Sequence, residues 1–155
     1  MMKTRIGLRL FLGVFPLLFA LYPHGGQCLN LITPDEAAQP DAPIPRGIKL
    51  TTIEGNGPQI KIYSPNLEEP LRVPFMMDIA FEASSDKTID PTSLAIKYLK
   101  LIPIDLTGRM KPYLNGNRLV VKDLKVPQGK HRLQLSIAYT SGEKTMMEFV
   151  LNVEK

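Results

Sequence analysis

The sequence has few of the side chains on which protein chemistry most often depends. It contains one cysteine, two histidines and no tryptophan among its 155 residues. A single cysteine, Cys28, excludes an intramolecular disulfide, so the fold must be stabilised by packing. The two histidines, His24 and His131, lie far apart in the sequence, and no serine-hydrolase, zinc-protease or phosphate-binding glycine motif occurs. We therefore predict a protein that is not an enzyme and that needs no cofactor.

Long apolar runs are also scarce, and the one that stands out lies at the N-terminus. Lys3, Arg5 and Arg9 precede about a dozen apolar residues that end at Tyr22. This is the layout of a secretory signal, and the run is too short for a transmembrane helix. We therefore predict a signal peptide over 1–28 and a periplasmic or otherwise exported protein.

Cys28 leaves two outcomes open for the processing of this signal. The small residues Gly26 and Cys28 suit cleavage after Cys28. Alternatively, Cys28 is the lipidated first residue of a lipoprotein, although Gly25 and Gln27 depart from the usual lipidation signal. In both cases we expect contact with a membrane only through the signal segment or through a lipid on Cys28.

Net charge gives no basis for nucleic-acid binding once the signal is removed. The signal takes three of the 19 basic residues, which leaves 16 basic against 15 acidic ones, a net charge of +1. The remaining charge is uneven, because 33–90 has five basic and ten acidic residues, whereas 94–132 has nine basic and two acidic. A basic face in 94–132 would favour an anionic surface polymer or lipid, or an acidic protein. The alternative is that these charges scatter over a solvated surface.

The segment after the signal is rich in proline and acidic residues. Four prolines between residues 34 and 45 leave little apolar material. We therefore predict an extended linker over 29–57, with one possible short strand at 48–53. The remaining residues, 58–155, have the ordinary size of one domain with its own core.

Apolar and polar residues alternate repeatedly in 58–155, which is the pattern of half-buried strands. In one such run Met77, Ile79 and Phe81 share a face, and Asp78 and Glu82 lie on the opposite, solvated one. The other runs are 60–63, 94–98, 119–121, 131–139 and 146–153. About six or seven strands in a domain of this size predict an all-β fold, namely a two-sheet antiparallel β-sandwich.

Three stretches go beyond general alternation. Ile89–Leu94 (IDPTSL), Val126–Leu133 (VPQGKHRL) and Ile62–Pro65 (IYSP) resemble motifs of bacterial Ig-like domains. The resemblance covers about 58–153 and departs at Tyr139, where the family usually has aspartate. It implies an Ig-like sandwich of about seven strands. Such domains serve as spacers, stalks and binding modules, and the family supplies no catalytic residues.

One group of candidate binding residues lies in 102–114, where two prolines prevent a central strand. Arg109, Lys111 and Tyr113 have polar tips suited to a binding loop at the end of the sandwich. The alternative is that this segment plugs the core, with Thr107 capping one helical turn.

A second group lies in the hairpin 126–144. Lys130 and Arg132 are candidates for contact with an anionic partner. The alternative is that they form only the solvent-exposed face of the hairpin, with His131 at the wet start of its first strand.

Methionine suggests a different function. Met76–Met77 and Met146–Met147 are pairs on two predicted strands. Thioether and imidazole ligands suit Cu(I), so Met76, Met146 and His131 define the alternative of a periplasmic copper-binding sandwich. Met77 and Met147 have the parity of core residues and are expected to fill gaps between the sheets.

Together these patterns predict a non-catalytic, exported Ig-like module. It would bind or position another cell-envelope component, either an envelope protein or an anionic surface polymer.

Overall fold

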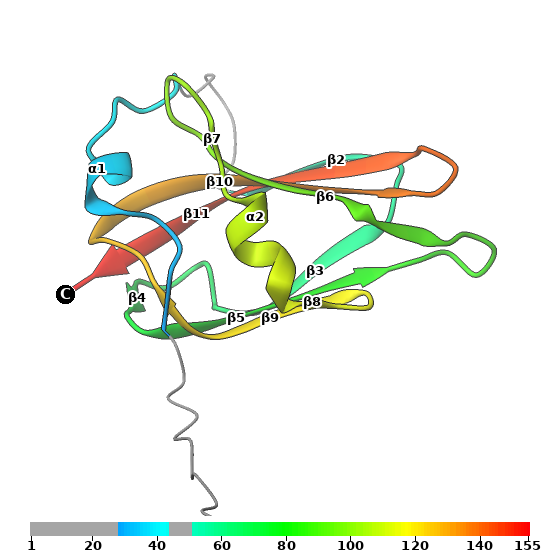
Figure 1. Cartoon of the computed structure of the whole chain (residues 1–155), viewed down its shortest axis with the longest axis horizontal. Coiled ribbons are helices and arrows are strands. Elements are labelled where there is room, and N and C mark those ends of the chain that lie inside the picture. Colours follow the sequence, from blue (N-terminus) through cyan, green and yellow to red (C-terminus); the bar gives the residue numbers. More distant parts are fainter. Residues whose placement is uncertain (1–27, 44–50) are drawn as a thin grey trace, which may run out of the picture.

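A computed structural model describes residues 28–43 and 51–155, and it shows a chain built mainly of β-strands in two sheets (Figure 1). The predicted signal peptide, 1–28, lies outside the described residues except for Cys28. Within the described part of the chain, no helix is long and apolar enough to cross a membrane.

One sheet has five strands and the other has six. The five-stranded sheet contains β1 (Leu29–Asn30), β3 (Gln59–Ser64), β5 (Phe75–Glu82), β8 (Leu114–Asn115) and β9 (Arg118–Lys125). Its order is β1–β9–β5–β3, and β8 also pairs with β9. The six-stranded sheet contains β2 (Thr51–Gly55), β4 (Leu71–Arg72), β6 (Ile89–Tyr98), β7 (Ile104–Asp105), β10 (Gly129–Tyr139) and β11 (Lys144–Glu154). Its order is β2–β11–β10–β6–β7, and β4 also pairs with β11.

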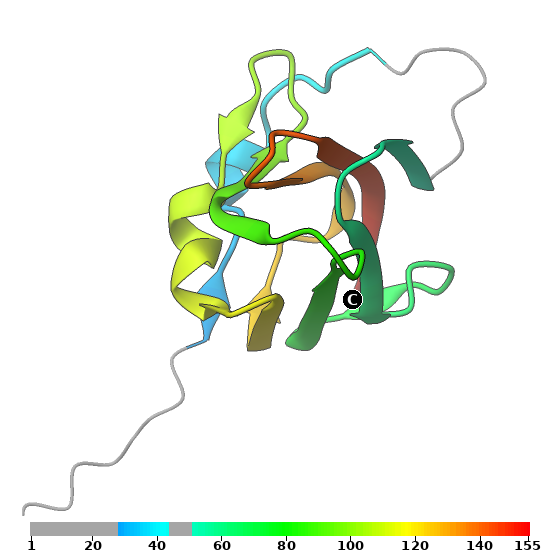
Figure 2. The same ribbon diagram turned by 90° about the vertical axis from the view of Figure 1, so that its right-hand side faces the viewer.

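The two sheets face each other as two layers with the core between them (Figure 2). Inward residues of β5 such as Met77, Ile79 and Phe81 are buried, and so are Met147 and Phe149 of β11. The predicted alternation and the all-β, two-sheet architecture are therefore confirmed. The short strands β1, β4, β7 and β8 were not predicted, because two residues are too few to show a period.

The hairpin of β10 and β11 is the longest pairing, with a continuous antiparallel register from Gly129 opposite Val153 to Ala138 opposite Lys144. Gly142 in its turn has φ +99°, a conformation that side chains rarely adopt. Tyr139 follows the paired residues and is 3% exposed. Its hydroxyl accepts a hydrogen bond from Ser84 N at 3.1 Å, so this tyrosine ties the hairpin to the turn between β5 and β6.

Within the segment 102–114, residues 106–114 plug the core, which is one of the two alternatives predicted. After β7 it forms α2 (Thr107–Met110) and the 3-10 helix η1 (Lys111–Tyr113). Leu106 is 0% exposed and Met110 is 1% exposed. Thr107 is not the N-cap residue, because Leu106 holds that position.

The structure differs from the predicted linker most clearly at its start. Residues 28–43, which we call the strap, lie against the sandwich beside α2, as Figures 1 and 2 show. β1 pairs in parallel with β9, Leu31 and Ile32 are 0% and 2% exposed, and α1 (Pro34–Ala37) forms one helical turn. The strap therefore belongs to the folded unit. Two adjacent buried apolar residues, Leu31 and Ile32, help to anchor a segment whose overall composition predicted an extended chain.

Further along the predicted linker, β2 covers 51–55 and overlaps the short strand expected at 48–53. Residues 44–50, including part of that strand, lie outside the described residues.

Truncation of the strap anchor tests this packing. We expect Leu31→Ala to lower the free energy of unfolding by about 2–5 kcal/mol, because it opens a cavity under the strap. Asn30→Ala, at the exposed neighbouring position, should change it by less than about 0.5 kcal/mol. Chemical denaturation of both variants provides the measurement, and equal midpoints for Leu31→Ala and the unmodified protein would show that the strap does not pack.

Candidate functional site at the strap

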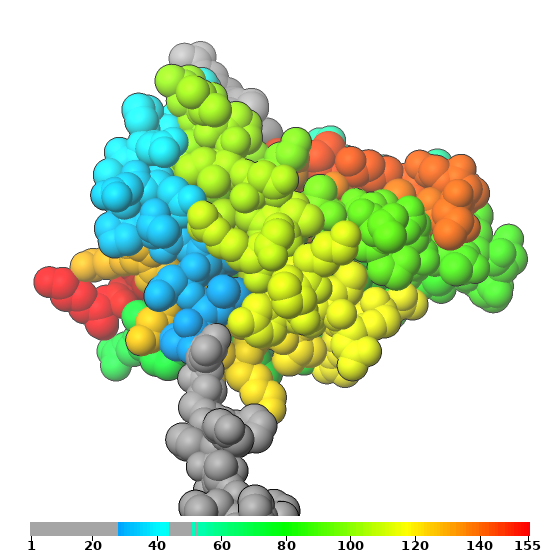
Figure 3. All heavy atoms as spheres, in the orientation of Figure 1, coloured from blue at the N-terminus to red at the C-terminus, as the bar shows by residue number. Residues whose placement is uncertain are grey.

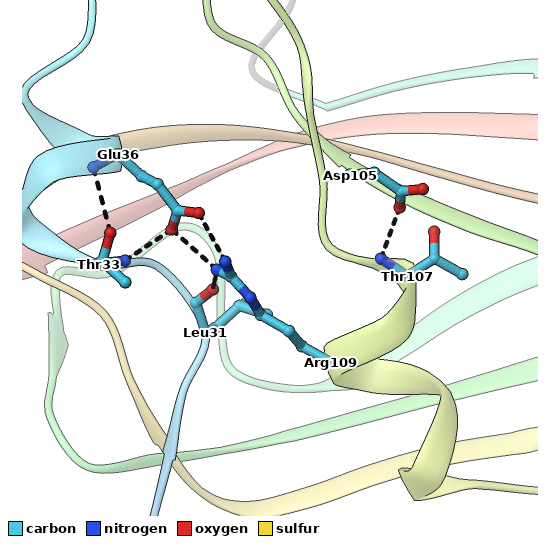
Figure 4. Close-up of polar contacts among 6 residues, drawn as sticks. All are labelled: Leu31, Thr33, Glu36, Asp105, Thr107 and Arg109. Atoms are coloured by element: carbon cyan, nitrogen blue, oxygen red, sulfur yellow. Dashed lines mark hydrogen bonds and ion pairs between the residues drawn. The ribbon is translucent and has the colours of Figure 1, made fainter.

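The helical turn of the strap is specified by four consecutive residues, Thr33-Pro-Asp-Glu36. The Thr33 hydroxyl accepts a hydrogen bond from Glu36 N at 3.2 Å, and the Glu36 carboxylate accepts one from Thr33 N at 2.9 Å. This reciprocal arrangement is a capping box, and Pro34 at the first turn suits a helix start. The turn fixes the Glu36 side chain in a position from which it faces α2 (Figure 4).

Arg109 joins α2 to the strap through three hydrogen bonds (Figure 4). Its guanidinium donates to both carboxylate oxygens of Glu36, at 2.8 and 2.6 Å, and to the Leu31 carbonyl at 2.6 Å. The planar fork of an arginine matches a carboxylate in this way. The hydrogen bonds from Arg109 lower the pKa of Glu36 to about 2.

Lys100 is the second connection between the strap and the sandwich, and it is 3% exposed. Its ammonium donates to Asp41 at 2.6 Å and to the Ala37 carbonyl at 2.8 Å, and it lies 4.8 Å from the centre of the Tyr98 ring. Burial alone lowers the pKa of Lys100, but the hydrogen bonds with Asp41 and Tyr98 outweigh it and the pKa is raised. The lysine is therefore charged, and the strap supplies its hydrogen-bond acceptors.

His131 contacts Tyr98, as Lys100 does, and it is 3% exposed. The prediction that His131 is exposed to solvent is therefore wrong. Nε2 is 2.8 Å from the Pro127 carbonyl and Nδ1 is 2.8 Å from the Tyr98 hydroxyl. Because a carbonyl only accepts, Nε2 carries the proton and neutral Nδ1 accepts from Tyr98. Burial, together with the nearby Lys100 charge, lowers the pKa of His131 despite the hydrogen bond to Pro127.

The acidic and basic excesses along the sequence meet in ion pairs within the same chain. Besides Glu36 with Arg109 and Asp41 with Lys100, Asp78 receives two hydrogen bonds from Arg118, at 2.8 and 2.7 Å. Asp78 was expected to be solvated but is 7% exposed, and its hydrogen bonds with Arg118 lower its pKa. Part of the predicted basic face is therefore already neutralised by the acidic half of the chain.

The five predicted binding residues do not gather at one place. Arg109 is engaged by the strap, and Arg132 donates to the Pro43 carbonyl at 3.3 Å and lies 3.7 Å from Glu148. Tyr113 packs against the core, and Lys111 is exposed beside it. Lys130 lines a cavity of about 130 Å³ with Glu68, Glu69 and residues of β11.

The three predicted copper ligands are also separated. Met76 is an exposed residue of β5, in the five-stranded sheet, whereas Met146 and His131 belong to the six-stranded sheet. In the hairpin, Met146 lies opposite Ser136 and His131 opposite Leu151, five positions further along β11. That offset is about 16 Å along the strands. The structure therefore does not bring these side chains together.

A groove of about 460 Å³ lies beside the strap, and it was not predicted from the sequence. Its lining combines strap residues with the ends of β9 and the β4–β5 turn. They are Asn30, Ile32, Thr33, Pro34, Val73, Lys125, Val126 and Pro127. The walls are mainly aliphatic or proline, and exposed Lys125 adds one positive charge. Sequence reasoning missed the groove because its walls come from three separate segments, and the pair Leu31–Ile32 was the one available signal.

Comparison with known proteins finds no family model that matches the chain, no similar curated protein and no similar solved structure. Among residues 28–43 and 51–155, no three histidine, cysteine, aspartate or glutamate side chains are grouped so that they could hold a metal ion. The groove, with the strap that forms one wall, is therefore the feature on which a functional proposal can rest.

The burial of His131 predicts a loss of stability in mild acid. The native state holds the histidine neutral, whereas the unfolded chain protonates near pH 6.5. Acid therefore favours unfolding as the pH falls below that value, by at most about 1.4 kcal/mol per pH unit for one proton. Urea unfolding between pH 8 and 5 should show a steeper loss for the unmodified protein than for His131→Gln, and parallel curves would contradict the assignment.

The role of Arg109 predicts a local effect on the strap. Hydrogen bonds to charged groups contribute about 1.5–3 kcal/mol each, so Arg109→Met should make the strap amides exchange at least about tenfold faster. Leu31 N and Ala37 N, both hydrogen-bonded in the structure, are the reporters. The amides of β10 and β11 should not change. Lys111→Met is the matched control, and equal exchange in the two variants would remove Arg109 from this role.

Proposed function

We propose that the chain is a non-catalytic, exported β-sandwich module of the Ig-like kind, which binds or positions another cell-envelope component through the groove beside the strap. Three observations support the proposal: the secretory pattern of 1–28, the two-sheet fold and the preformed groove. The groove carries the argument, because binding sites are usually concave, mainly apolar and largely preformed.

The strap gives this groove a fixed wall. Ile32 and Pro34 line the groove from the strap. Hydrogen bonds from Arg109 and Lys100 hold the strap on the two sides of α1. The opposite wall includes Pro127, whose carbonyl is hydrogen-bonded to His131. A groove with both walls held in place loses little entropy when a partner binds.

The side chains most suited to other activities are engaged in the fold. Both ring nitrogens of His131 have hydrogen-bond partners, which leaves neither free for acid–base work or for a metal. No observation favours the copper alternative, since Met76 and Met146 lie on different sheets. An anionic polymer as partner is also weakened, because Arg109 and Arg132 already have acidic partners within the chain.

Site-specific photo-crosslinking in intact cells tests the proposal. A photoreactive residue at Val73, which lines the groove and is 41% exposed, should give a covalent adduct recovered in the envelope fraction. The same probe at Tyr63, which is 60% exposed on β3, should not. A probe at Val73 that gives no adduct, or adducts at both positions alike, would contradict a role for the groove.

A further inference from the structure

A row of four side chains connects the strap to the turn that precedes β10. Asp41 of the strap accepts a hydrogen bond from the Lys100 ammonium at 2.6 Å, and this ammonium lies 4.8 Å from the centre of the Tyr98 ring. The Tyr98 hydroxyl is 2.8 Å from Nδ1 of His131, whose Nε2 is 2.8 Å from the Pro127 carbonyl. Lys100, Tyr98 and His131 are 3%, 1% and 3% exposed. We call Asp41, Lys100, Tyr98 and His131 the relay.

The strap end, residues 37–41, closes the relay at the surface of the molecule. Figure 3 shows the strap in blue and cyan against the yellow-green residues of the β6–β7 loop and α2. Lys100 donates to the Ala37 carbonyl at 2.8 Å, and Leu101 N donates to the Pro40 carbonyl at 2.8 Å. The bridge between Asp41 and Lys100 is an isolated one, outside the strands of both sheets. The strap end can therefore separate without breaking any pairing between those strands.

The relay is satisfied only while His131 is neutral. Nδ1 accepts the Tyr98 hydroxyl proton, so a proton on Nδ1 removes the acceptor that this hydroxyl uses. The same proton places a second positive charge near the buried Lys100 ammonium. Besides Tyr98, the charged groups of the described chain that act on His131 are Lys100 and Asp41. The other neighbours of the ring are uncharged, namely Leu151 opposite it on β11 and Gly129.

Two buried cations that share one carboxylate are unfavourable, and Lys100 is the one that can leave. His131 belongs to β10, which is paired on both sides, and its ring is held by the Pro127 carbonyl. Lys100 follows the end of β6 and has a long flexible stem. The side chain of its partner Asp41 is 73% exposed, so solvent begins directly beside the ammonium.

We propose that the strap end is an acid-released clasp, in which protonation of His131 drives the Lys100 ammonium into solvent and detaches residues 37–41 from the sandwich. The ammonium then gives up its hydrogen bonds to Asp41 and to the Ala37 carbonyl for hydrogen bonds to water. Leu101 N loses the Pro40 carbonyl at the same time. This device is a property of the chain itself and requires no ligand in the groove.

The direction of the pH effect follows from the two states of the strap end. While it is attached, burial and then the Lys100 charge lower the pKa of His131 below its ordinary value of 6.5. Release admits water and removes the Lys100 charge, so the pKa of His131 rises toward that value. The attached state therefore keeps its full stability above about pH 6.5. Below that pH it weakens at most about tenfold per pH unit for one proton.

Hydrogen exchange of the full protein, followed by NMR between pH 7.5 and 5.5, tests the clasp. The measured quantity is the protection factor, which corrects for the pH dependence of the exchange chemistry itself. Leu101 N reports the strap end, and Phe81 N, bonded to the Asn117 carbonyl, reports opening of the five-stranded sheet. Leu101 N should be less protected than Phe81 N at every pH. Its protection should be constant above pH 6.5 and fall several-fold, at most about tenfold, by pH 5.5.

Two variants separate the clasp from a general effect of acid. His131→Gln cannot take up a proton, so the protection of Leu101 N should not change with pH. Lys100→Met leaves no charge to expel, so protection should be low and equally independent of pH. Lys97→Met, the matched control at an exposed lysine of β6, should respond like the unmodified protein.

Circular dichroism checks that each variant is folded, and Lys100→Met alone supplies the test if His131→Gln is not. Constant protection of Leu101 N in the unmodified protein would overturn the clasp. So would an unchanged pH response in His131→Gln or in Lys100→Met. Equal protection of Leu101 N and Phe81 N at every pH would overturn it too, because the strap end would then separate only when the whole chain unfolds.

Discussion

The buried ammonium of Lys100 is the interaction on which the strap side of the molecule depends. A charge that is 3% exposed requires hydrogen-bond acceptors, and Asp41 and the Ala37 carbonyl supply them. The strap therefore cannot separate from the sandwich without leaving this charge unpaired or exposing it. Arg109 adds a second attachment at Leu31, which precedes α1, and at Glu36, so the strap is fixed on both sides of α1.

This arrangement gives the uneven charge of the sequence a structural explanation. A basic stretch often indicates that a protein binds an acidic partner. In this chain, several of the basic residues are paired with acidic residues of the same chain. Glu36, Asp41 and Asp78 come from the acidic half and meet Arg109, Lys100 and Arg118 of the basic half. Near the strap, Asp41 and Lys125 remain exposed together with the apolar residues Val73, Leu101 and Ile102.

Burial was predicted correctly from the sequence where it follows from the alternation of side chains within a single strand. The alternation in β5, β10 and β11 predicted which apolar residues are buried, because successive side chains of a strand point to opposite faces, although Asp78 and Ser136 of the opposite faces are buried as well. The alternation did not predict the burial of His131. That burial depends on Tyr98, which ends β6, and on Lys100 in the loop that follows β6. Prediction from the sequence also failed for the strap, since composition averaged over 29–57 hid the two apolar residues that anchor it.

The sequence by itself therefore determined the class of fold and the longer strands, and it limited 102–114 to a core plug or a binding loop. These follow from periodicity and from proline, which act between residues close along the chain. Only the tertiary structure decided which charges pair, where the groove lies and that Leu101 and Ile102 remain uncovered. Each of those features depends on segments that are far apart in the sequence. A local sequence pattern does not show which distant segment will pack beside a given residue.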